Sequence, residues 1–68
     1  MTKQEYEKKR RLLSAKLVDA REKAGLTQKQ VADTKIITQS ELSKLENSSR
    51  RVDFILLLEL ANLYNQPI

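Results

Sequence analysis

Apolar residues recur at helical intervals over the first third of the chain. When successive residues are placed about 100° apart, one side of a helix gathers five of them: Tyr6, Leu13, Leu17, Ala20 and Ala24. The surrounding positions are rich in Lys, Glu, Leu and Ala, which favour helices. We therefore predict a first helix over residues 2–24. It ends at Gly25, because glycine readily takes the left-handed conformation that follows a last helical turn.

Two similar motifs mark the starts of the next two helices. Thr27-Gln28-Lys29-Gln30 and Thr38-Gln39-Ser40-Glu41 each place a hydroxyl three residues before a Gln or Glu, which is the pattern of a capping box. The second helix fades near Thr34, which leaves Lys35-Ile36-Ile37 as a short connection. Two short helices joined in this way predict a helix-turn-helix.

The predicted third helix has a packing side and a free side. Leu42 and Leu45 lie on the packing side, with Glu46 near its edge. The opposite arc holds four polar residues and no acidic one: Ser40, Ser43, Lys44 and Asn47. We therefore expect one face to pack on the core and the other to meet a ligand.

A polar, basic segment at residues 47–51 precedes a fourth predicted helix. Asp53 is its expected N-cap, and Val52 and Leu57 have the spacing of a hydrophobic staple. This helix runs to about Tyr64.

Composition narrows the possible functions. The 68 residues contain no cysteine and no histidine, which excludes disulfides, zinc–thiolate sites and histidine-based metal binding or catalysis. Because a glycine-rich phosphate loop is also missing, we expect a protein that is not an enzyme, with no catalytic residues, no metal and no cofactor. The net charge of +4 suits a polyanionic partner such as nucleic acid.

The same composition sets the fold class. One Gly and one Pro leave little scope for a β-sandwich or β-barrel, so we expect an all-α, compact bundle of four to five helices. It forms a single domain, 1–68, in which residues 1–12 are a helical N-terminal extension. A fifth helix, begun at Gln66-Pro67, is expected to be missing or truncated after residue 68. No apolar run approaches the roughly 20 residues that span a bilayer, and no secretory signal is evident, so we expect a cytoplasmic protein without membrane contacts.

The run from Leu17 to Leu63 resembles the Cro/CI-type helix-turn-helix domain of the XRE family, the transcriptional regulators of bacteria and phages. The resemblance is carried by six groups of residues: Arg21, Gly25-Leu26-Thr27-Gln28, Val31-Ala32, Thr38-Gln39-Ser40, Leu42-Ser43-Lys44-Leu45-Glu46-Asn47 and Leu60-Ala61. It implies a lambda-repressor-like fold and sequence-specific binding of double-stranded DNA by a repressor, with helix 38–46 in the major groove.

The resemblance also implies which residues contact DNA. The expected base contacts are Gln39, Ser40, Ser43 and Lys44. The expected phosphate contacts are Thr27, Gln28, Asn47, Ser49 and Arg50. Glutamine can bond adenine through two hydrogen bonds, and lysine can reach guanine or a phosphate. The family further implies a structural ion pair between Arg21 and Glu46.

Two residues depart from the family pattern. Ile36 and Ser48 stand where the family has glycine. Because a bulky β-branched residue is strained at positive φ, we expect Ile36 to avoid that region and the chain to leave the second helix about one residue differently.

The fourth predicted helix also indicates that the chain associates with a second copy of itself. From Phe54 to Tyr64 only Glu59 and Asn62 are not apolar, so this helix needs cover on more than one side. We expect a homodimer with its contact at Phe54, Ile55 and Leu58, bound to a palindromic operator.

Other functions remain open on the sequence alone. The main alternative is a protein-binding helical module, antitoxin-like or partner-binding, with degenerate DNA contacts. The chain could also be the specificity segment of a larger protein. No small-molecule ligand is indicated.

Overall fold

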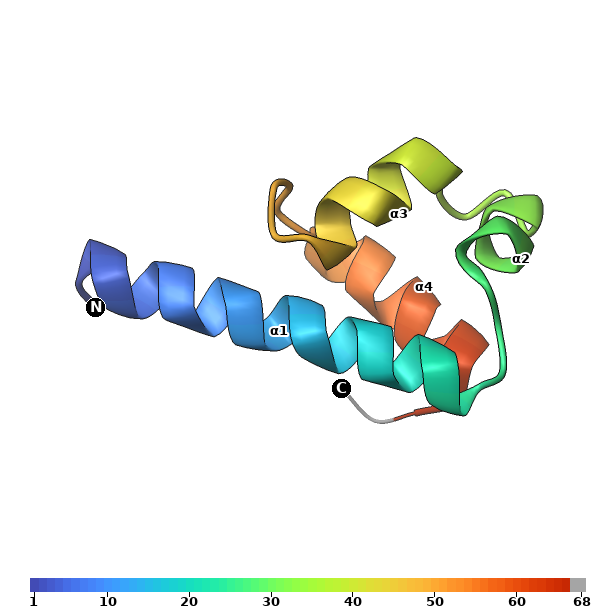
Figure 1. Ribbon diagram of the computed structural model, residues 1–68, viewed down its shortest axis with the longest axis horizontal. Helices are drawn as coiled ribbons and strands as arrows, with labels where there is room; N and C mark the ends of the chain where they lie inside the picture. Colours follow the sequence, from blue (N-terminus) through green and yellow to red (C-terminus); the bar gives the residue numbers. More distant parts are fainter. Residues whose placement is uncertain (67–68) are drawn as a thin grey trace.

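Among residues 1–66, which the computed structural model describes, four helices pack around one core (Figure 1). In chain order they are α1 (Lys3–Lys23), α2 (Gln28–Asp33), α3 (Gln39–Glu46) and α4 (Phe54–Tyr64). No strand occurs in this part of the chain, so the expected all-α fold is confirmed. The fifth helix expected from Pro67 onward lies outside the described residues. None of the helices described is both long and apolar enough to cross a membrane.

Each helix begins at a side chain that caps its first turn. The caps are Thr2, Thr27, Thr38 and Asp53, and each accepts a hydrogen bond from the backbone N–H three residues on. At α2 the capping box is complete, because Gln30 Oε1 also accepts the Thr27 N–H at 2.8 Å. The helices therefore start where the sequence predicts.

The second expected capping box, at the start of α3, forms only in half. The Glu41 N–H donates to Thr38 Oγ1 at 3.1 Å, but the Glu41 carboxylate turns to Arg50 and forms an ion pair at 3.0 Å. A charged partner in reach gives this carboxylate a stronger hydrogen bond than a neutral backbone N–H would.

Left-handed residues end the helices. After α1, Gly25 has φ 73° and the Leu26 N–H donates to Arg21 O at 3.2 Å, a Schellman ending. Ser48 has φ 68° after α3. In the connection between α2 and α3 it is Lys35, with φ 70°, that takes the left-handed conformation. The expectation that Ile36 avoids positive φ is therefore confirmed, since the chain turns one residue earlier.

The core takes residues from every helix and from the connection between α2 and α3. Its members are at most 9% exposed: Leu17, Ala20, Val31, Ile37, Leu42, Leu45, Leu56, Leu60 and Tyr64. In α1 the buried residues begin only at Ser14. The first turns of α1 therefore extend past the body of the molecule, as Figure 1 shows.

The left-handed lysine predicts a stabilising substitution. Lys35→Gly should raise the free energy of unfolding by about 0.5–1 kcal/mol, because glycine carries no Cβ to strain at φ 70°. Urea denaturation measures this. The control, Lys16→Gly in the exposed middle of α1, should lower it by about 1 kcal/mol. A loss of stability in both variants would contradict the assignment.

Candidate nucleic-acid interface

The two sides of α3 differ as the sequence predicts. Leu42 and Leu45 are 0% and 1% exposed and anchor the helix to the core. The residues expected to contact bases are all exposed: Gln39, Ser40, Ser43 and Lys44. The opposite side of α3 is thus polar, accessible and free to meet a ligand.

Both carboxylates of α3 are held by arginines. Glu41 pairs with Arg50, and Glu46 pairs with Arg21. Opposite charges this close offset each other, so neither glutamate leaves an isolated negative charge beside the exposed face. Lys44 on that face therefore meets little opposing charge from its own helix.

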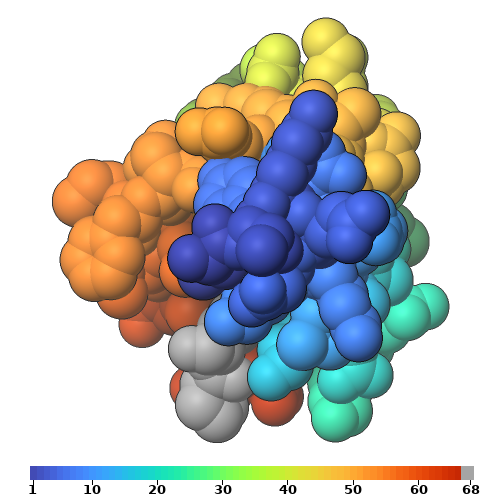
Figure 2. Space-filling view, turned by 90° about the vertical axis from the view of Figure 1, so that its left-hand side faces the viewer, coloured from blue at the N-terminus to red at the C-terminus, as the bar shows by residue number. Residues whose placement is uncertain are grey.

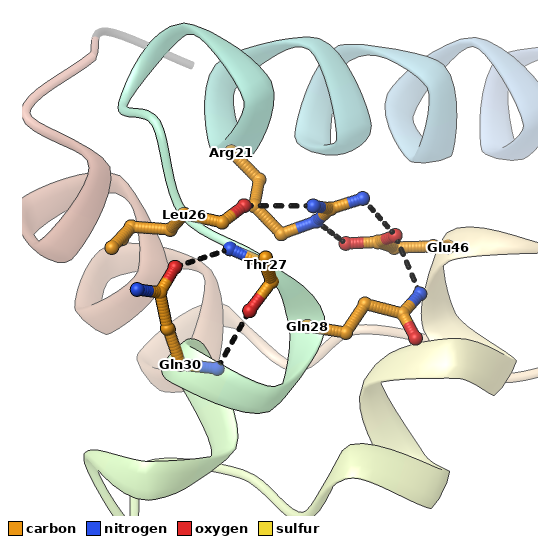
Figure 3. Close-up of polar contacts among 6 residues, drawn as sticks. All are labelled: Arg21, Leu26, Thr27, Gln28, Gln30 and Glu46. Atoms are coloured by element: carbon orange, nitrogen blue, oxygen red, sulfur yellow. Dashed lines mark hydrogen bonds and ion pairs between the residues drawn. The ribbon is translucent and has the colours of Figure 1, made fainter.

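The Arg21–Glu46 ion pair links α1 to α3 (Figure 3). Arg21 Nε donates to Glu46 Oε2 at 2.8 Å, and Arg21 Nη2 donates to Glu46 Oε1 at 3.2 Å, so the contact is bidentate. The two side chains are 15% and 6% exposed. Arg21 Nη1 also donates to Leu26 O at 2.8 Å, which ties the turn after α1 to the same guanidinium.

Gln28, at the start of α2, joins the same carboxylate. Its Nε2 donates to Glu46 Oε1 at 2.9 Å (Figure 3). Glu46 is therefore the point at which α1, α2 and α3 meet. Because an amide nitrogen carries two hydrogens, Gln28 keeps a second N–H for another acceptor. Thr27 beside it uses its hydroxyl oxygen as the cap of α2.

The ion pair affects two pKa values. Hydrogen bonding of the Arg21 guanidinium to the Glu46 carboxylate, which accepts, raises the pKa of Arg21, although burial acts against it. Burial, with a smaller contribution from the negative charge of Glu46, raises the pKa of Tyr64 to about 12. The Tyr64 phenol is 1% exposed, and its hydroxyl has no hydrogen-bond partner among the described residues. It therefore stays neutral beside the ion pair and adds no competing charge.

The segment after α3 is held by short-range hydrogen bonds. Ser49 donates through its N–H to Lys44 O at 2.9 Å and to Asn47 Oδ1 at 3.0 Å. Its hydroxyl bonds the same two oxygens. Asn47 and Ser49, both expected to contact phosphates, are exposed in this turn. Arg50, expected to do the same, instead points back to Glu41 and is only half-exposed.

Sequence reasoning missed two contacts between α1 and the end of α3. Arg10 Nη2 donates to Ser48 O at 3.0 Å, and the Ser14 hydroxyl donates to Leu45 O at 2.9 Å. The signal was present, since Arg10 falls between Tyr6 and Leu13 on the packing side of a helix. The Arg10 bond satisfies the carbonyl of Ser48 just beyond α3. The Ser14 bond adds a second donor to Leu45 O, which also accepts the Ser48 N–H at 3.3 Å.

Comparison with known proteins identifies the type of domain. The family profile described as "Helix-turn-helix" matches residues 17–68. The chain is also 45% identical over 53 residues to the HTH-type transcriptional regulator ImmR of Bacillus subtilis (strain 168). That match covers 78% of this chain and 42% of ImmR, so the chain spans less than half the length of this relative. No solved structure gives a significant match.

The buried pair generates a stability prediction. Arg21→Met should cost about 3–5 kcal/mol of unfolding free energy, because it leaves the Glu46 carboxylate buried without a counter-charge. The double variant Arg21→Met/Glu46→Leu should lose less than the two single variants together. Denaturant titration measures all three.

An exposed ion pair supplies the control. Lys23 and Asp19 lie 2.9 Å apart with side chains 62% and 63% exposed, so Lys23→Met should cost less than about 0.5 kcal/mol. An Arg21→Met variant as stable as Lys23→Met would contradict the role given to Arg21.

Proposed function

Because the chain belongs to the helix-turn-helix family, we propose that it is the DNA-binding domain of a transcriptional repressor that binds a specific site in double-stranded DNA. The observation that carries this proposal is the exposed face of α3, which is polar and unopposed by free carboxylates. The net charge of +4 supports it, since phosphate neutralisation supplies much of the affinity of such domains.

In this proposal α3 enters the major groove and reads bases through its exposed side chains. The contacts come from Gln39, Ser40, Ser43 and Lys44. Gln39 is the first residue of α3, and the N-terminal residues of a recognition helix meet base edges in this class of domain. Its amide can bond adenine through two hydrogen bonds, which makes it the most discriminating of the four.

Phosphate contacts flank this helix on two sides. They come from Thr27, Gln28, Asn47, Ser49 and Arg50. The second N–H of Gln28 can donate to a phosphate while the first stays on Glu46. To contact a phosphate, Arg50 must break its ion pair with Glu41. The free-energy cost of breaking it is small, because the two side chains are 35% and 40% exposed.

We further propose that two copies of the chain associate through the start of α4. Phe54, Ile55 and Leu58 are 71%, 67% and 51% exposed, although they are among the largest apolar residues of the chain. Exposed apolar patches of this kind mark contact surfaces. A second copy on this patch would present a second recognition helix, which suits a palindromic operator.

The same patch favours a second candidate function, a module that binds another protein through its helical surface. The two functions differ in their response to salt. Phosphate contacts give a steep fall of DNA affinity with salt, whereas a module that binds only protein gives almost none. Titration of random duplex at several salt concentrations therefore decides between them.

The two groups of DNA contacts should respond differently to mutation. Gln39→Ala should cost about 1–3 kcal/mol on the preferred site and little on random duplex, because base contacts form only in the correct register. Arg50→Ala should weaken both complexes about equally and reduce the salt slope by about one unit. Filter binding on both duplexes measures this, after selection from a random pool has supplied the preferred site. Identical behaviour of the two variants would contradict the division of contacts.

The proposed dimer predicts a concentration-dependent mass. Ile55→Lys should raise the dissociation constant of self-association at least about tenfold, because it buries a charge in an apolar contact. Asn62→Lys adds the same charge to an exposed position of α4 outside the patch and should change it little. Sedimentation equilibrium distinguishes the two. A parent chain that stays monomeric at high micromolar concentration would contradict the dimer.

A further inference from the structure

A hollow of about 240 Å³ lies between the N-terminal half of α1 and the segment after α3. Figure 2 looks onto this end of the molecule, where the first turns of α1 (blue) lie beside that segment (gold to orange). The apolar lining comes from Leu13, Leu17, Leu45 and Val52, with Tyr6 beside them. The hollow is therefore mostly hydrocarbon, and water in it finds few hydrogen-bond partners.

Cationic residues join this apolar lining. Lys9, Arg10, Arg50 and Arg51 all line the hollow, and no Asp or Glu does. Arg51 lies over the Tyr6 ring at 5.2 Å, and Arg10 bonds only a backbone carbonyl. Neither forms an ion pair among the described residues. The lining thus combines hydrocarbon with the positive charges of Arg10 and Arg51, which no carboxylate among the described residues balances.

Arg50, which also lines the hollow, is already engaged elsewhere. Its Nε is occupied by Glu41, but its Nη1 is buried and has no hydrogen-bond partner within the described part of the chain. Burying such a donor unpaired is costly. An acceptor that entered the hollow could instead meet the guanidinium groups of Arg10 and Arg51, which line it and form no ion pair among the described residues.

The size of the hollow limits the ligand. An apolar cavity of about 150 Å³ is enough to hold benzene, so the volume here suits a molecule of about ten non-hydrogen atoms. A free phosphate would make no contact with the apolar lining that its own chemistry favours. A plain hydrocarbon would give Arg10 and Arg51 no negative charge to pair with. Only a molecule with both an apolar body and one anionic group fits both features.

We propose that this hollow binds a small organic monoanion, a carboxylate on an aromatic or aliphatic body of about ten non-hydrogen atoms. Its body packs against Leu13, Leu45 and Val52. Its carboxylate meets the guanidinium groups of Arg10 and Arg51, which are suited to bidentate pairing. The site shares only Arg50 with the proposed DNA contacts, and the groups assigned to the carboxylate are Arg10 and Arg51, so either proposal can fail without the other.

The test uses 3-phenylpropionate and its neutral amide, 3-phenylpropanamide, as probes. Titration of the ¹⁵N-labelled 68-residue chain by NMR should shift the amides of Tyr6, Arg51 and Val52, with a dissociation constant of about 0.1–5 mM. The neutral amide should bind at least about fivefold more weakly, because it cannot pair with a guanidinium.

Three variants locate the site. Arg51→Gln should lower the affinity for 3-phenylpropionate and leave the affinity for the neutral amide unchanged. The matched control, Arg11→Gln, removes the same charge from an exposed position of α1 that does not line the hollow, and it should change neither. Val52→Phe fills the hollow and should abolish both, while circular dichroism verifies that the chain remains folded.

Four outcomes would overturn the proposal. They are no shift at these residues up to about 10 mM probe, equal affinity for the acid and the amide, an equal loss in Arg11→Gln and Arg51→Gln, and tighter binding of inorganic phosphate at the same residues. The last would mark the hollow as a phosphate subsite.

Discussion

The buried carboxylate of Glu46 is the constraint on which the arrangement of the first three helices depends. It is 6% exposed, so its charge has lost most of its water. Three N–H groups replace that water, two from Arg21 in α1 and one from Gln28 in α2. Each donor comes from a helix that must therefore stand at a fixed place beside α3. The same contact orients the Gln28 amide, so one carboxylate joins the packing of the domain to the edge of its candidate interface.

The other carboxylate of α3, that of Glu41, is much more exposed than that of Glu46. The side chains of Glu41 and Arg50 are 40% and 35% exposed, far more than that of Glu46, so their ion pair contributes less to stability and exchanges more easily. Backbone strain follows a similar division. Lys35 and Ser48 adopt left-handed conformations that suit glycine better, and both lie in connections that bound α3. The connections on either side of the candidate recognition helix thus carry backbone strain, whereas the Arg21–Glu46 ion pair that anchors the helix is closely hydrogen-bonded.

Much of this structure could be predicted from the sequence because it is set locally. Helix starts follow from Thr and Asp caps, and the two sides of α3 follow from helical periodicity. The rest depends on distances between segments. Whether the Glu41 carboxylate returns to Thr38 or turns to Arg50 cannot be read from spacing alone. The hollow beside α1 is likewise invisible in the sequence, because its lining comes from three parts of the chain that only folding brings together.

The overhang of α1 gives a single helix two levels of local stability. Its buried residues, Ser14, Leu17 and Ala20, all lie in the second half, so opening that half requires the core to open. Beyond the Thr2 cap, the first turns are tied to the rest of the molecule by Arg10 and by the stacking of Arg51 on Tyr6. Amide hydrogen exchange should therefore be fast near Glu5 and approach the global limit near Leu17. We therefore expect the end of α1 to unwind and re-form at a lower free-energy cost than opening of the helix-turn-helix.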